Sequence, residues 1–207
     1  MIGHALAIGP RPATRVGWDR AIALGFAVGS LCFFIGPFPG FVELVGVGAD
    51  AVVFFAGSIF FTLAATLELR EATVTRGRRF GEDPSWWSAS IQWVGTLLFN
   101  VNTFDAMQSG LTTSQENKLV FAPDLFGSSC FLVSSVIAYR VASGASLRMA
   151  AVNLAGSILF GVSALASYVV PSSGSMLDLA AVNWSTALGA LCFLIGAVML
   201  LQSSKET

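Results

Sequence analysis

Several polar side chains that could do chemistry lie inside apolar stretches of this 207-residue sequence. Gln92, Thr96 and Asn100 recur at intervals of four, followed by Thr103, so they share one face of a helix. The candidate intramembrane polar residues are Gln92, Thr96, Asn100, Asn102, Asp105, Asp124, Ser128, Asn153 and Asn183. Such groups are costly in lipid unless they find partners or line a hydrated path. Hydrogen bonding between helices and a polar pathway are therefore the two explanations for this set.

Other kinds of chemistry find little support in the sequence. The only histidine is His4, and no spacing typical of metal ligands or of a nucleophile with its base is present. Cys32, Cys130 and Cys192 each lie inside an apolar run, which favours small buried hydrophobic residues over a disulfide framework. We therefore expect no enzyme activity, no cofactor, no metal site and no nucleic-acid partner.

The elements that position these residues are membrane spans. Hydrophobic residues make up 55% of the chain and charged residues only 11%, far below the roughly 25% typical of soluble domains. About 20 apolar residues are needed for a helix to cross a bilayer. The sequence predicts an all-α membrane protein with six spans, at about 21–38, 50–68, 87–106, 120–140, 149–170 and 177–201.

Basic residues predict the orientation of these spans. Only Lys118 falls between spans on one side of the predicted membrane, and the other basic residues fall on the opposite side, including Arg76, Arg78 and Arg79 between the second and third spans. Positively charged loops stay in the cytoplasm. We therefore expect a multi-pass protein of the bacterial inner membrane, with a cytoplasmic segment at 1–20, a transmembrane domain at 21–201 and a cytoplasmic tail at 202–207.

One motif recurs in all six predicted spans: a glycine, a small residue, two further residues and a phenylalanine. The glycine and phenylalanine pairs are Gly29 and Phe33, Gly57 and Phe61, Gly95 and Phe99, Gly127 and Phe131, Gly156 and Phe160, and Gly189 and Phe193. Glycine lets two helix backbones approach closely, and such packing drives helix association in lipid. The motif therefore predicts a helix-packing device; use of the glycines as hinges or as a pore constriction is the alternative.

The spacing of the motifs favours three repeated two-helix hairpins. Asp50, Asp124 and Asp178 each lie near the start of the second helix of a hairpin, where an aspartate can cap the helix. On the hairpin pattern, most clearly at Gly127 to Ala138 and Gly156 to Ala166, the chain resembles the YrhK-like family of small bacterial membrane proteins. The resemblance implies an architecture of paired helices and implies no activity.

Two functions fit these features. Transport or conduction of a small solute or ion, through a polar path between spans three to six, is the leading interpretation. The alternative is a non-catalytic membrane scaffold or accessory subunit. The expected partners are the lipid bilayer and either further copies of the chain or another membrane protein.

Overall fold

The computed structural model describes residues 13–75 and 83–204. It is almost entirely helical, as the sequence predicts. His4 and five of the basic residues lie outside the described part, namely Arg11, Arg76, Arg78, Arg79 and Lys205.

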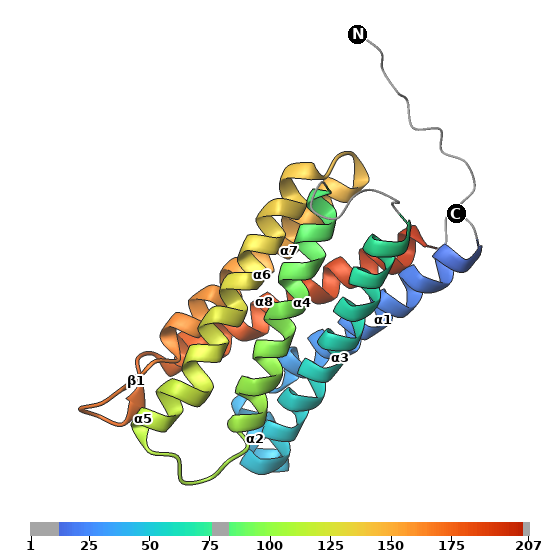
Figure 1. Ribbon diagram of the computed structural model, residues 1–207. Coiled ribbons are helices and arrows are strands. Elements are labelled where there is room, and N and C mark those ends of the chain that lie inside the picture. The colour runs from blue at the N-terminus through green and yellow to red at the C-terminus, as the bar shows by residue number, and fades with distance from the viewer. Residues whose placement is uncertain (1–12, 76–82, 205–207) are drawn as a thin grey trace.

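Six long helical segments run along one bundle (Figure 1). Their bounds are α1 Ala13–Ile35, α3 Val47–Thr75, α4 Pro84–Asp105, α6 Ala122–Val141, α7 Ala145–Ala166 and α8 Leu179–Ser203. Shorter elements occupy the turns at one end: α2 Pro39–Val45, α5 Thr113–Gln115, a π-helix η1 Glu116–Phe121, and the strands β1 Val169–Val170 and β2 Ser175–Met176. The start of α1 and the end of α8 lie together at the opposite end (Figure 1).

Each predicted span corresponds to one of these segments, and the differences at the ends have local causes. The fourth begins earlier than expected because α5, η1 and α6 follow one another from Thr113 to Val141. The fifth ends at Ala166 rather than near 170, and the chain then forms the β1–β2 turn around Pro171. The residue that precedes a proline is biased toward extended dihedral angles, which agrees with the strand conformation of Val170 and prevents α7 from continuing through this point.

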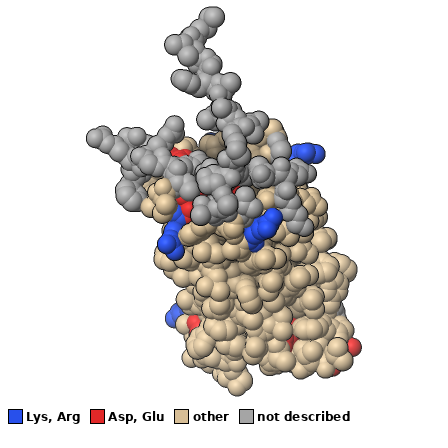
Figure 2. Space-filling model, turned by 90° about the vertical axis from the view of Figure 1, so that its right-hand side faces the viewer, with Lys and Arg blue, Asp and Glu red and all other residues tan. Residues whose placement is uncertain are grey.

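Among the described residues, five helical segments are long and apolar enough to cross a membrane: Gly17–Ile35, Val47–Val74, Thr113–Val141, Ser146–Ala166 and Leu179–Ser203. Helix α4 is as long as α7 but is not one of the five, because it carries the richest set of polar side chains. The broad band of uncharged surface in Figure 2 separates Lys and Arg residues near one end from the few charged groups near the other. The chain is therefore an all-α protein with the features of a membrane protein.

Helix contacts close the bundle into a ring. Each helix packs against the next in the order α1, α3, α4, α6, α7 and α8, and α8 packs back against α1. The motif glycines lie where the two helices of a pair touch. A Cβ atom added to Gly127 would lie 3.1 Å from the Gly95 carbonyl oxygen, and one added to Gly95 would lie 3.0 Å from the Gly127 oxygen. The pairs Gly29 with Gly57 and Gly156 with Gly189 show the same close approach.

The residue that follows each motif glycine is also enclosed. Its exposed fraction is at most 1% in every helix, at Ser30, Ser58, Thr96, Ser128, Ser157 and Ala190. A larger side chain at this position has no room, which gives a physical reason for the small residue in the second place of the motif.

The six motif phenylalanines form the centre of the bundle, here called the phenylalanine core: Phe33, Phe61, Phe99, Phe131, Phe160 and Phe193. They make two triangles. Phe33, Phe99 and Phe160 have ring centroids 5.9 to 6.2 Å apart. The centroids of Phe61, Phe131 and Phe193 lie 5.8 to 6.2 Å apart.

The two triangles are joined within each helix pair. The centroid distances are 5.5 Å for Phe33 with Phe61, 5.0 Å for Phe99 with Phe131 and 5.2 Å for Phe160 with Phe193. Each pair therefore contributes one ring to each triangle. Rings at these separations attract one another beyond the burial of their area.

Candidate functional site

A polar cavity lies on each side of the phenylalanine core. The smaller one, the Glu68 chamber, has a volume of about 140 Å³ and is bordered by Phe61, Phe131 and Phe193. Its polar lining residues come from four helices: Glu68, Ser88, Gln92, Ser135 and Asn153. The chamber lies toward the end of the bundle where α1 starts and α8 ends.

Several polar groups of the Glu68 chamber take part in hydrogen bonds between helices. Gln92 lies between two neighbouring helices: its Nε2 donates to Glu68 Oε2 at 3.3 Å, and its Oε1 accepts from Ser134 Oγ at 3.2 Å. Ser88 Oγ lies 3.0 Å from Ser134 Oγ. A chain of side-chain hydrogen bonds therefore links α3, α4 and α6.

The Asp124 chamber lies on the other side of the core, with a volume of about 310 Å³, and is bordered by Phe33, Phe99 and Phe160. Its lining carries two carboxyl groups, of Asp50 and Asp124, and further oxygen-bearing side chains from Asn102, Thr103, Ser128, Ser163, Ser167, Asn183 and Thr186. Both volumes exceed the roughly 10–15 Å³ that one water molecule needs. The two chambers are therefore large enough for water or a small solute.

The turn between α7 and α8 borders the Asp124 chamber. Met176 of β2 is one of its lining residues. The turn is held against the neighbouring helix by Asn117 of η1, whose Nδ2 donates to the Val169 oxygen at 2.8 Å and whose Oδ1 accepts from the Val169 N–H at 2.9 Å. Phe121 packs edge-on against Tyr168, with centroids 5.2 Å apart. These contacts fix this wall of the chamber.

Some polar groups of the Asp124 chamber have no partner in the structure. Ser128 Oγ is one of them, although the residue is only 1% exposed. Asp50 Oδ1 is another buried oxygen without a hydrogen bond. The carboxyl group of Asp124 is hydrogen-bonded by the Asn102 side chain. The chamber therefore presents free oxygen atoms, which distinguishes it from the Glu68 chamber.

The candidate residues named from the sequence do not meet in one place. Gln92 and Asn153 line the Glu68 chamber, whereas Asn102, Asp124, Ser128 and Asn183 line the Asp124 chamber. The remaining three line neither chamber: Thr96, Asn100 and Asp105. The chambers receive side chains from all six long helices, whereas the sequence placed the polar residues in the last four.

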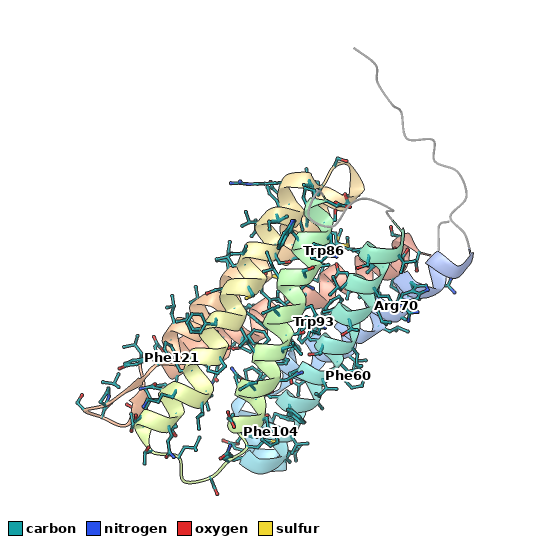
Figure 3. The ribbon with its side chains drawn as sticks, viewed as in Figure 1. Phe60, Arg70, Trp86, Trp93, Phe104 and Phe121 are labelled. Atoms are coloured by element: carbon teal, nitrogen blue, oxygen red, sulfur yellow. The ribbon has the colours of Figure 1, made fainter. Side chains whose placement is uncertain are left out.

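The polar stripe of α4 serves mainly to bind α3. Asn100 Nδ2 donates to Thr62 Oγ1 at 2.9 Å, and Thr103 Oγ1 lies 2.9 Å from Ser58 Oγ. Thr96 Oγ1 donates within its own helix, to the Trp93 carbonyl oxygen at 2.7 Å. Trp93 of α4, labelled in Figure 3, donates from Nε1 to Thr66 Oγ1 at 2.9 Å. Hydrogen bonding between helices therefore explains much of the stripe.

Two carboxyl groups that are absent from the candidate residues named from the sequence line the chambers. Glu68 lines one chamber, and Asp50, for which the sequence predicts helix capping, lines the other. Asp178 does cap α8, because its Oδ1 accepts from the Ala181 N–H at 2.9 Å. The capping prediction is wrong for Asp124, which lies inside a helical segment that begins at Thr113. A periodicity argument could not separate these cases, since it contains no information about which face meets a cavity.

No group of three or more His, Cys, Asp or Glu residues that could hold a metal ion occurs in the part of the chain that the structure describes. The cysteines Cys32, Cys130 and Cys192 are free. Their Cβ atoms lie against motif glycines of the paired helix: a Cβ added to Gly57 would lie 2.7 Å from the Cβ of Cys32. These thiols are part of the close helix packing.

Comparison with known proteins adds one result. Residues 12–72 match the model of the YrhK-like protein family. The YrhK-like segment spans α1, α2 and most of α3, so the expected resemblance is confirmed on the first helix pair rather than on the segments where the motif is clearest. No curated protein and no solved structure matches the chain. The family description names no activity, so the function must be argued from the chambers.

Proposed function

We propose that this chain is a six-span protein of the bacterial inner membrane that lets a small polar solute or ion pass along the bundle axis. The observation that carries the proposal is the placement of two polar chambers on the two sides of one phenylalanine core. In this arrangement the core is the closed barrier and the chambers are the vestibules. A hydrophobic constriction between hydrated vestibules is a recognised way to gate conduction.

The sixth span in this proposal is α4. It packs along both α3 and α6, which are apolar enough to span. Two of its polar side chains bond neighbouring helices: Asn100 donates from Nδ2 to α3, although its Oδ1 has no partner, and Gln92 bonds both α3 and α6. A helix whose polar groups are satisfied by adjacent helices can cross a bilayer despite a lower hydropathy.

The proposed orientation places both ends of the chain in the cytoplasm. Arg20 near the start of α1, Arg70 near the end of α3, Arg140 at the end of α6 and Arg148 at the start of α7 all belong to the end of the bundle with the termini, whereas Lys118 belongs to the other end. Arg70, labelled in Figure 3, lies over the Trp18 ring at 4.9 Å from its centroid. An arginine over an indole ring makes a cation–π contact, and tryptophan is enriched at membrane interfaces.

A threefold internal repeat supports passage along the axis. In this proposal the pairs α1 with α3, α4 with α6, and α7 with α8 are repeats of one hairpin, each contributing one glycine contact and two rings of the phenylalanine core. Repeats related by an axis along the membrane normal place equivalent side chains around that axis. The bundle axis is then the place where a path can form.

Flux measurements on the full chain in liposomes test the proposal. We expect wild-type vesicles to take up a small solute or ion faster than empty vesicles, and Phe131→Ala to raise this rate because it opens the barrier. Phe104→Ala is the control, since Phe104 is 53% exposed on the outside of α4. Equal rates for empty, wild-type and Phe131→Ala vesicles, with the variant shown to be folded, would overturn the proposal.

A non-catalytic scaffold or accessory subunit is the second candidate, and Gly161 favours it. A Cβ added there would meet no atom within 4 Å, so this glycine offers a close-packing position that the chain itself does not use. Small residues at such positions are typical of helix interfaces in membranes. Absence of flux, together with crosslinking of Gly161→Cys chains to one another, would support a homo-oligomeric scaffold.

A further inference from the structure

The charge of the Asp124 chamber points to a class of solute. Asp50 and Asp124 bring two carboxyl groups to its lining, and none of its lining residues, all of which the structure describes, is Lys, Arg or His. Acidic side chains within a membrane are expensive unless they are paired. Since the lining supplies no cationic side chain, a bound cation is the partner that fits, and anions are disfavoured.

An unpartnered hydroxyl gives independent evidence of a ligand. Ser128 Oγ lines the chamber, is buried and makes no hydrogen bond. Two of its counterparts in the motif are satisfied: Ser58 Oγ pairs with Thr103 Oγ1 at 2.9 Å, and Ser157 Oγ with Ser135 Oγ at 2.7 Å. Ser30 Oγ has no partner either, but Ser30 lines neither chamber, so Ser128 is the unpartnered motif serine that faces a cavity. An unsatisfied buried oxygen costs free energy. A cation held by Ser128 would remove that cost.

Apart from the Met176 thioether, the possible cation ligands of the chamber are side-chain oxygens. Carboxyl, amide and hydroxyl oxygens from Asp50, Asp124, Asn102, Asn183 and Thr186 line it, without a thiol or imidazole. Oxygen donors select hard cations such as those of the alkali and alkaline-earth metals. The lining carries two carboxyl groups rather than three or more, which fits a singly charged ion better than a divalent one.

We propose that the Asp124 chamber binds a small monovalent metal cation, sodium or potassium, through oxygens of Asp50, Asp124 and Ser128. The inference rests on the proposed function and names its solute class. The Glu68 chamber is not such a site, because its lining, which consists of described residues, carries one carboxyl group and no buried side-chain oxygen without a hydrogen-bond partner. It would serve as the second vestibule.

Thermal unfolding of the full chain in detergent tests binding without requiring flux. Choline chloride is replaced stepwise by sodium or potassium chloride at constant ionic strength. A cation that binds only the folded protein should raise the melting temperature by about 3–6 °C at ten times its dissociation constant, and the rise should saturate. An unchanged melting temperature with both salts would overturn the proposal.

Variants locate the site. Asp124→Asn should abolish the shift, and Ser128→Ala, which removes a hydroxyl without a partner, should reduce it while leaving the fold intact. Asp105→Asn is the matched control, because Asp105 lies outside the chamber and bonds Gln108 at 2.7 Å. A full shift in both Asp124→Asn and Ser128→Ala would place the ion elsewhere and refute the assignment.

The outcomes separate this inference from the proposed function. A saturable rise in the melting temperature without flux in liposomes would support the cation site and refute passage along the axis. Flux without any change in the melting temperature, and without preference for sodium or potassium over a neutral solute, would support passage along the axis and refute the cation site.

Discussion

The two chambers differ in how their polar groups are satisfied. In the Glu68 chamber, Gln92 bonds both Glu68 and Ser134, so three helices supply each other's partners. In the Asp124 chamber, which has more than twice the volume, Ser128 and one oxygen of Asp50 have none. One chamber is thus closed by internal hydrogen bonds, and the other keeps oxygens available.

This difference separates polar groups that stabilise the bundle from polar groups that are available to bind a ligand. Hydrogen bonds between helices in lipid contribute modestly, on average about 0.6 kcal/mol and up to about 1.7 kcal/mol. A group without a partner contributes nothing and costs desolvation. Polar residues that stabilise the bundle should therefore weaken it when removed, whereas residues kept for a ligand should not.

The largest loss of stability is expected from a change in the phenylalanine core, which lies between the two chambers. Phe99→Ala removes a fully buried ring that stacks on Phe131 at 5.0 Å and leaves a cavity in the core. We expect the free energy of unfolding to fall by about 3–5 kcal/mol. Thermal and denaturant unfolding in detergent measure it, with Phe104→Ala on the same helix as the control. Similar losses for both variants would show that the phenylalanine core is not a special packing centre.

The second-largest loss of stability is expected when a glycine contact that supports the core is overpacked. In Gly189→Val, the new Cβ would lie 2.5 Å from a Phe160 ring atom and 3.0 Å from the Gly156 oxygen. Overpacking of this kind costs about 1–3 kcal/mol. Gly161→Val on α7 is the control, because nothing lies within 4 Å of its added Cβ. The melting temperature should fall for the first variant and stay nearly constant for the second.

A smaller effect is expected in the Glu68 chamber. Gln92→Ala removes the bonds to Glu68 and Ser134, and we expect a loss of about 1–2 kcal/mol. The free energy of unfolding is measured for Gln92→Ala, for Glu68→Gln and for the double variant, which isolates the contact between the two side chains. If the two single changes in this free energy add up to the change in the double variant, the contact does not stabilise the bundle. The contrast between the chambers would then lose its basis.

The smallest effect is expected from Ser128→Ala in buffer without sodium or potassium. Because the hydroxyl has no partner, its removal should change the free energy of unfolding by less than about 0.5 kcal/mol, or raise it. The measurement is the same unfolding experiment in choline chloride. A clear loss of stability would show that Ser128 has a structural bond, and the two chambers would then use polarity alike.

Prediction from the sequence worked best where one-dimensional patterns decide the result. Apolar runs separated by turns predict where the long helices lie, and the repeated glycine and phenylalanine predict that each helix presents one small and one bulky residue at a similar depth. The motif could not reveal that the rings of α1, α4 and α7 face one chamber and those of α3, α6 and α8 the other, since this depends on where three helix pairs meet.

The sequence by itself determines where the helices lie, the low content of charged residues and which residues can bring helix backbones together. These features follow from local composition and helical periodicity. Only the tertiary structure decided which polar groups are satisfied. Gln92 and Ser128 both look like intramembrane polar residues in the sequence. Helices α3 and α6 place partners beside Gln92, whereas the hydroxyl of Ser128, on α6, has no hydrogen-bond partner. Whether a buried oxygen is bonded depends on neighbours that are distant in the chain.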